Sequence, residues 1–434
     1  VMGRQYAREL DLAHRLDNEE LRTARLREIE RDLRDPALEH LRSGGGSSSV
    51  EKPTYAEALI AFYEGRYDEA LTATRQAFIE EKWLYEAKRL EGEILLMMAA
   101  EKRINGDATG AFEDLENADD AYRAAAEIAR SDPSIYEGVC SLWTQLLDIR
   151  SRRGEPVVEA FENAVTACDR SLFIDPERAD GHERLSHLHW RWADIVGDRG
   201  GNPGPFLENA ISEADRAIAL DPDSVAAYFT KGGALTVTAL GELARGEDPR
   251  QTLALAIESY ETAVRINPGA VLAHDDLGYA WERVARHEMT IGLDPRPSLE
   301  KAVSAFRRAN DLNPNYANAY NNSGITLWRR AVFELRTGSD PRNTLDEAVS
   351  AFDAAIQRNR SYAYAFANRG LARRTTAMYL LDKGSDPTAP LNLARTDLET
   401  ALLLNPQIFW AYPEKTAVEL LAARWADEAC LLYT

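Results

Sequence analysis

Residues 313–358 read NPNYANAYNNSGITLWRRAVFELRTGSDPRNTLDEAVSAFDAAIQR, and stretches of the same design recur along much of the chain. Two pairs of residues mark this stretch, Asn313-Pro314 and Asp340-Pro341, and each pair recurs with a period of 46 residues. The first returns as Asp175-Pro176, Asp221-Pro222, Asn267-Pro268 and Asn405-Pro406, with Asn359-Arg360 at the one intermediate position that lacks the Pro. The second returns as Asn202-Pro203, Asp248-Pro249, Asp294-Pro295 and Asp386-Pro387. Asp or Asn before Pro is typical of a helix start, because its side chain caps free backbone N–H groups and Pro suits the first helical position. Two marks in each period therefore predict two helices in each period.

Small and apolar residues occupy fixed places between the marks. Gly324 lies ten residues after Pro314, Leu345 lies 31 after it, and Ala348 and Ala355 lie 34 and 41 after it. Most copies keep the same kind of residue at these places. We expect small residues where two antiparallel helices approach each other closely, so the pattern predicts an all-α protein built from helix pairs.

The arrangement resembles the tetratricopeptide repeat, in which an aromatic residue precedes a Gly by four positions and two Ala lie seven apart. Tyr320, Gly324, Ala348 and Ala355 carry this resemblance. The usual repeat has about 34 residues, with roughly 12 between the Gly and the first Ala. Here that interval is 24 residues, which indicates longer helices and a longer connection. The resemblance implies a right-handed α–α superhelix of about eight helix pairs with a C-terminal capping helix.

Three segments are expected along the chain. Residues 1–42 form a charged helical lead, residues 43–50 a Gly/Ser linker, and residues 51–434 the solenoid. The solenoid is expected to contain one repeat of ordinary length at 51–84, two irregular repeats at 85–175, five 46-residue repeats at 176–405 and a terminal helix at 406–434. The lead segment is a candidate for self-association.

Composition narrows the classes of partner and site. The formal net charge of −20 disfavours nucleic acid and anionic membranes as partners. No stretch approaches the ~18 apolar residues of a membrane span, and the N-terminal sequence lacks the apolar segment of a signal peptide. Cys140, Cys168 and Cys430 are too few for a disulfide framework or a zinc cluster. We therefore expect a cytoplasmic protein without cofactor or metal. Cys140 and Cys168 are expected to pack in the core of one repeat, and a redox pair is the alternative for them.

One motif invites a catalytic interpretation. His182 and His187 flank Glu183 as in a zinc-protease helix, but that signature requires two His four residues apart. Five residues turn the second His roughly 140° round the helix. We therefore interpret both as packing residues and predict no catalytic residue.

Candidate binding residues lie on the first helix of each pair, which lines the concave groove in the family that the chain resembles. Asp276, Asn322 and Asn368 share one repeat position, and an Asn at the matching place in that family holds the backbone of a bound peptide. Further along the same helices a basic stripe contains Arg283, Arg329 and Arg374. The guanidinium group of Arg suits carboxylates.

Two alternatives apply to these helices. Arg283 and Arg329 could pair within the chain with Glu282 or Glu334, as is common on long helices. Four tryptophans also lie on these helices, and we interpret most of them as core residues rather than as ligand contacts: Trp190, Trp281, Trp328 and Trp410. The six candidates predict a site around residues 270–380 for a protein or peptide, with an acidic or C-terminal segment as the favoured ligand.

The turn between paired helices carries a second resemblance. Its motif Gly-x-Asp-Pro-Arg-x-x-Leu, at 246–253, 292–299 and 338–345, is similar to a repeat downstream of the catalytic domain in multidomain bacterial serine/threonine protein kinases. No Gly-rich phosphate loop, His-Arg-Asp loop or Asp-Phe-Gly triplet is present in the sequence. The two hypotheses are thus a non-enzymatic interaction scaffold, or the regulatory part of a bacterial kinase whose catalytic domain is absent from this sequence.

Overall fold

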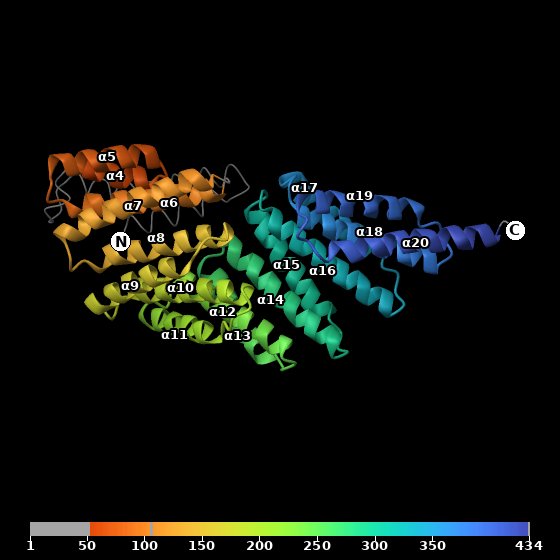
Figure 1. The fold of residues 1–434 in the computed structure, drawn as a ribbon. Helices are drawn as coiled ribbons and strands as arrows, with labels where there is room; N and C mark the ends of the chain where they lie inside the picture. Colours follow the sequence, from red (N-terminus) through yellow and green to blue (C-terminus); the bar gives the residue numbers. More distant parts are fainter. Residues whose placement is uncertain (1–52, 105–106, 433–434) are drawn as a thin grey trace, which may run out of the picture. The chain divides into compact units, whose positions relative to one another are not determined.

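Helices account for all the regular secondary structure in residues 53–104 and 107–432, which this computed structural model describes (Figure 1). The predicted lead at 1–42 and linker at 43–50 lie outside the described residues. This part of the chain has seventeen helices, which confirms the expected all-α fold class; seven antiparallel pairs are in contact, four from α4–α5 to α10–α11 and three from α14–α15 to α18–α19. We call the first helix of each pair its A helix and the second its B helix.

The pairs divide into two units, with the boundary between Thr238 and Ala239 inside α12. Unit 1 contains α4 (Pro53–Tyr63), α5 (Tyr67–Glu80), α6 (Tyr85–Ile104), α7 (Ala108–Ile128), α8 (Pro133–Arg152), α9 (Val158–Ile174), α10 (Ala179–Asp198), α11 (Gly204–Leu220) and the first part of α12 (Val225–Ala244). Unit 2 contains the rest of α12, α13 (Arg250–Ile266), α14 (Val271–Thr290), α15 (Arg296–Leu312), α16 (Ala317–Arg336), α17 (Arg342–Arg358), α18 (Ala363–Asp382), α19 (Thr388–Leu404) and α20 (Ala411–Leu432). In unit 2 each A helix from α14 onward also contacts the next A helix, so α14, α16, α18 and α20 form one layer.

The helices from α10 to α19 follow the 46-residue period. Each A helix here has 20 residues and each B helix has 17. The turn between them contains a glycine with positive φ, such as Gly338 at 78°, a conformation that favours Gly because it has no Cβ. The extra length of the repeat therefore lies in two long helices joined by a short turn.

The two Asp-Pro or Asn-Pro marks have different roles. At the second mark, Asp340 Oδ1 accepts a hydrogen bond from the backbone N–H of Arg342, 3.1 Å away, at the start of α17. The first mark is not a helix start, so that prediction is wrong: Asn313 is the C-cap of α15, and α16 begins at Ala317. Pro314 ends the preceding helix because it cannot donate to the helical ladder, and Asn313 Oδ1 accepts from Asn315 N–H instead.

The repeated small and apolar residues make the core. Ala348 and Ala355 are fully buried, as is Leu345, and their counterparts in the other 46-residue repeats are buried too. The glycine of the A helix was expected to lie against the backbone of the paired helix, but its neighbour is a side chain. A Cβ at Gly324 would lie 2.6 Å from the ring of Phe352, and one at Gly278 would lie 2.7 Å from Phe306. Glycine here makes room for a ring from the B helix, rather than for the neighbouring backbone.

Cys140 on α8 and Cys168 on α9 form a disulfide, with Cα atoms 5.3 Å apart. Both residues are buried, as expected, but the prediction of two packed thiols is wrong. Antiparallel pairing brings these positions together although they lie 28 residues apart in sequence. Disulfides are typical of oxidising compartments, whereas the small number of cysteines predicts a reducing one. The cytoplasmic location stays a prediction.

Candidate functional site

The candidate residues lie on α14, α16 and α18 in unit 2, where equivalent positions follow one another across the A-helix layer. Asn368 Nδ2 donates to Asn321 Oδ1 at 3.0 Å, and Asn322 Nδ2 donates to Asp275 Oδ1 at 3.2 Å. Asn321 Nδ2 lies 3.5 Å from Asn322 Oδ1, which connects the two bonds. We call these four residues the amide ladder. It joins three successive A helices and fixes the orientation of each carboxamide.

Asp275 forms the buried end of the amide ladder. Its Oδ2 accepts a hydrogen bond of 3.2 Å from the Tyr316 hydroxyl. Burial raises the pKa of Asp275 to about 6, although the hydrogen bonds from Asn322 and Tyr316 act in the opposite direction. The neighbouring candidate, Asp276, is half-buried on α14.

The three candidate arginines are paired within the chain. Arg329 forms an ion pair with Glu282 on α14, and the Nε atom of Arg283 lies 3.4 Å from the other oxygen of that carboxylate. Arg374 Nε lies 2.7 Å from Glu414 Oε2 on α20. Intramolecular pairing, the alternative considered for the basic stripe, thus describes all three guanidinium groups in this structure. Their part in binding stays a prediction.

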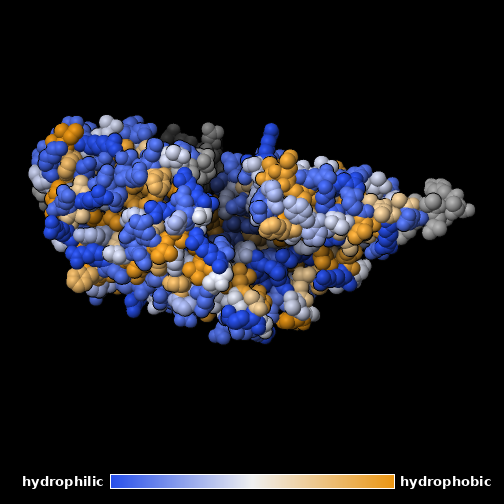
Figure 2. Space-filling view, viewed as in Figure 1, coloured by the Kyte–Doolittle hydropathy of each residue, from blue (hydrophilic) through white to orange (hydrophobic). Residues whose placement is uncertain are grey.

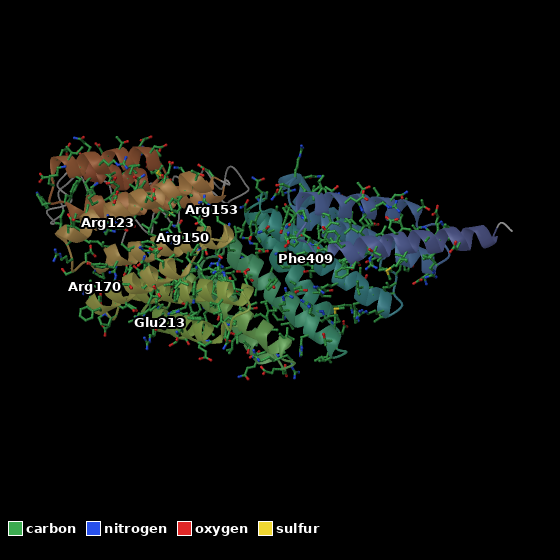
Figure 3. All side chains as sticks on the ribbon, viewed as in Figure 1. Arg123, Arg150, Arg153, Arg170, Glu213 and Phe409 are labelled. Atoms are coloured by element: carbon green, nitrogen blue, oxygen red, sulfur yellow. A yellow bond between two sulfur atoms is a disulfide. The ribbon has the colours of Figure 1, made fainter. Side chains whose placement is uncertain are left out.

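A hollow of about 350 Å³ is lined by residues of α16, α17 and α18 and by Trp410, which directly precedes α20. We call it the aromatic hollow; its walls include Asn321, Trp328, Arg329, Tyr362, Tyr364, Asn368 and Trp410. Tyr364 and Trp410 are exposed, at 47% and 38%. The preceding residue Phe409, labelled in Figure 3 next to α20, is also exposed. Figure 2 shows hydrophobic residues at the surface of unit 2 around this helix.

The aromatic hollow contains two of the six candidates, Asn368 and Arg329. Asp276, Asn322, Arg283 and Arg374 are not among its walls; Asn322 instead belongs to the ladder that orients Asn368. Trp328 packs against the buried core as well as lining the hollow, whereas Trp410 lines the hollow and is exposed. Sequence reasoning also missed Tyr364. Tyr364 and Trp410 lie 46 residues apart and so share one repeat position, and an aromatic residue at this position in two consecutive repeats was a signal that could have identified it.

The residues considered for catalysis have structural surroundings. His182 is buried, with its Nδ1 2.6 Å from Glu213 Oε2 and its Nε2 3.0 Å from the carbonyl oxygen of Pro176. His187 instead contacts the ring of Trp190. Within the described residues, no three His, Cys, Asp or Glu side chains are grouped so that they could hold a metal ion. Over that same part of the chain, none of the helices is both long and apolar enough to span a membrane.

Comparison with known proteins places the fold. No protein-family model and no curated protein matches the chain. Among solved structures, the alignment with a chain of the APC/C hetero-tetramer Cut9–Hcn1 covers 94% of this chain and 66% of the matched chain, at 15% sequence identity and a TM-score of 0.50. The chain has the tetratricopeptide-repeat fold.

Two further structures with this fold align over shorter parts of the chain. YrrB, described as a TPR protein with an unusual peptide-binding site, covers 58% of this chain and 98% of its own, at 20% identity and a TM-score of 0.34. A tetratricopeptide repeat protein from Parabacteroides merdae ATCC 43184 covers 76% and 98%, at 13% identity and a TM-score of 0.39.

Proposed function

We propose that this chain is a non-catalytic scaffold that holds a peptide, or an extended segment of a partner protein, against the A helices of unit 2. The observation that carries the proposal is the aromatic hollow. Its volume of about 350 Å³ falls at the lower end of the range for ligand pockets. A tetratricopeptide fold supports such a role because its stacked A helices form an extended surface.

The hollow has the chemistry to hold one apolar side chain together with its backbone. The rings of Trp328, Tyr364 and Trp410 can bury an aliphatic or aromatic group. Asn368 donates one amide hydrogen to Asn321, and within the described residues its Oδ1 atom receives no hydrogen bond. That oxygen can accept from a peptide N–H group.

The amide ladder prepares the site for binding. Because Asn368 is held by Asn321, which contacts Asn322 in turn, its carboxamide is already oriented before a ligand arrives. A fixed side chain loses less conformational entropy on binding than a mobile one. This arrangement gives Asn322 an indirect role, in which it positions Asn368 through Asn321.

The test uses a peptide selected from a random linear library on the full chain. Its affinity is measured by fluorescence anisotropy with the unchanged chain and with the variant Tyr364→Ala/Asn368→Ala. We expect the variant to bind at least about tenfold more weakly, which corresponds to about 1.4 kcal/mol. The control is Phe173→Ala, which removes an exposed ring from α9 in unit 1 and should leave the affinity unchanged.

Two results would contradict the proposal. One is that selected peptides bind the double variant as tightly as the unchanged chain, while circular dichroism shows the same helical content. The other is that selection on the full chain yields no peptide that binds it.

A further inference from the structure

A second hollow adjoins the aromatic hollow. Its volume is about 220 Å³, and it shares Trp328 and Arg329 with the first. We call it the basic hollow; its other walls include Arg286 and Met289 from α14 and Val332 and Arg336 from α16. The two hollows thus continue across the A-helix layer from α14 to α20, with one aromatic and one basic end.

The cations of the basic hollow are not equivalent. Arg329 is paired with Glu282. Arg286 and Arg336 are exposed, and neither forms an ion pair with any other residue that the structure describes. No Asp or Glu side chain contributes to the walls of the basic hollow. Two unpaired guanidinium groups beside apolar side chains are suited to a carboxylate, in a protein whose overall charge is −20.

The surroundings of Arg329 show the same excess of positive charge. Burial lowers the pKa of Arg329, and Arg286 and Arg283 lower it further, although Glu282 acts in the opposite direction. An incoming carboxylate would relieve this repulsion. Since Glu282 is shared between Arg283 and Arg329, it does not neutralise Arg286 and Arg336 as well.

We propose that the bound segment carries an Asp or Glu side chain that Arg286 and Arg336 hold in the basic hollow, beside the apolar residue that fills the aromatic hollow. This inference rests on the proposed function, because it specifies the ligand of the same surface. Packed helices lie about 8–10 Å apart, and an extended peptide rises about 3.3 Å per residue. The acidic and apolar residues of the segment are therefore about three positions apart.

The probe is a set of fluorescein-labelled peptides, acetylated and amidated so that only side chains differ in charge. Each contains one Phe in a Gly-Ser background and one Glu two, three, four or five residues before or after it. A matched set carries Gln in place of Glu. We expect a Glu peptide with a spacing of about three to bind the full chain about tenfold more tightly than its Gln counterpart at low salt, and this advantage to shrink as salt screens the charges.

The variant Arg286→Ala/Arg336→Ala should reduce the Glu-over-Gln advantage to less than twofold and leave the affinity of the Gln peptide unchanged. The control Arg265→Ala/Arg307→Ala removes the same charge from exposed positions on the B helices α13 and α15, and should preserve the advantage. Loss of the advantage in this control too would show that net charge, not the basic hollow, attracts the acid, which would overturn the inference.

Failure of this inference can be distinguished from failure of the proposed function. If Glu and Gln peptides bind equally well, and Tyr364→Ala/Asn368→Ala weakens both, the acidic subsite is refuted and the aromatic hollow stands. If no peptide of either set binds, both proposals are refuted.

Discussion

Gly278 and Gly324 show how one repeat position is fixed by its partner helix. Each faces the ring of a buried Phe from the following B helix. Where Leu398 replaces the Phe, Gly370 still has a side-chain carbon 2.9 Å from its hypothetical Cβ. The glycine is thus required by the volume of its neighbour, although Gly lowers helix stability by about 1 kcal/mol relative to Ala.

This contact predicts the effect of Gly324→Ala. The new Cβ would overlap the Phe352 ring, which is buried and must shift to admit it, so we expect unit 2 to lose about 1–3 kcal/mol of unfolding free energy. Urea denaturation followed by circular dichroism measures the change. Gly241→Ala in α12 is the control, because its Cβ would meet only the flexible end of Arg245, and it should be neutral or stabilising. Equal effects of the two substitutions would contradict the packing account.

Asp275 predicts a pH dependence. The folded-state pKa of about 6 exceeds the ordinary value of 3.8, so the unfolded chain releases this proton first as the pH rises. The carboxyl therefore costs no stability below pH 4, becomes destabilising between pH 4 and 6, and costs up to about 3 kcal/mol above that. We expect Asp275→Asn to raise the unfolding free energy at pH 7.5 and to have little effect at pH 4.

The measurement for Asp275 is urea denaturation at both pH values. Asn can still accept from Asn322, and can donate to the Tyr316 hydroxyl. Asp311→Asn, at an exposed site on α15, serves as control and should change stability by less than about 0.5 kcal/mol at either pH. A destabilised Asp275→Asn variant at pH 7.5 would refute the account of the buried carboxyl.

At the scale of helices, α18 and α19 are joined by one buried carboxylate. Asp397 on α19 accepts from Arg369 at 2.5 Å and from Arg373 at 2.6 Å, and its side chain is almost inaccessible to solvent. Arg369 also pairs with Asp353 on α17, whose side chain is 42% exposed. The same guanidinium thus has a buried and an exposed partner.

The difference in burial between Asp397 and Asp353 predicts unequal losses of stability when each is replaced. Asp397→Asn leaves the largely buried guanidinium of Arg373 without a counter-charge and leaves Arg369 with only the exposed Asp353, so we expect a loss of about 3 kcal/mol in the unfolding free energy. Asp353→Asn should cost less than about 1 kcal/mol, because water screens that pair. Urea denaturation of both variants in parallel measures the two losses of unfolding free energy. Similar losses would mean that burial does not set the strength of these links.

The 46-residue period predicted which helices form, because it repeats residues that local chemistry and close packing require. It did not separate a helix end from a helix start, since Asn before Pro serves both purposes and only the partner of its side chain decides. The site was predicted less completely for a related reason. Arg286 and Arg336 occupy different repeat positions, so no periodic signal identifies them. Which arginines are paired depends on contacts between helices 40 or more residues apart, as for Arg329 and Glu282.

At the scale of the whole molecule, a repeat fold should tolerate removal of a full period. Deleting residues 317–362 would join Tyr316 to Ala363, the same dipeptide that occurs at 316–317 and 362–363. Because each pair contacts only its neighbours, α15 would then pack on α18 as it now packs on α16. We expect a folded protein with unchanged helical content per residue, as measured by circular dichroism and thermal unfolding.

The matched deletion removes only residues 317–339, so that α15 would be followed by another B helix. This variant should lose cooperative unfolding in unit 2, since α17 would have no A helix to pair with. Similar behaviour of the two deletions would contradict the repeat account. The resemblance to a region downstream of bacterial kinase domains stays a prediction, which the fold alone does not test.

The central claim, that the A helices of unit 2 hold a peptide, is tested most directly by photo-crosslinking. A selected peptide with a photoreactive residue at its apolar anchor is irradiated on the full chain, and mass spectrometry identifies the modified residues. We predict modification of α16, α18 and the start of α20, with Tyr364 and Trp410 among the sites. Modification confined to the B helices α15, α17 and α19, or to unit 1, would contradict the claim.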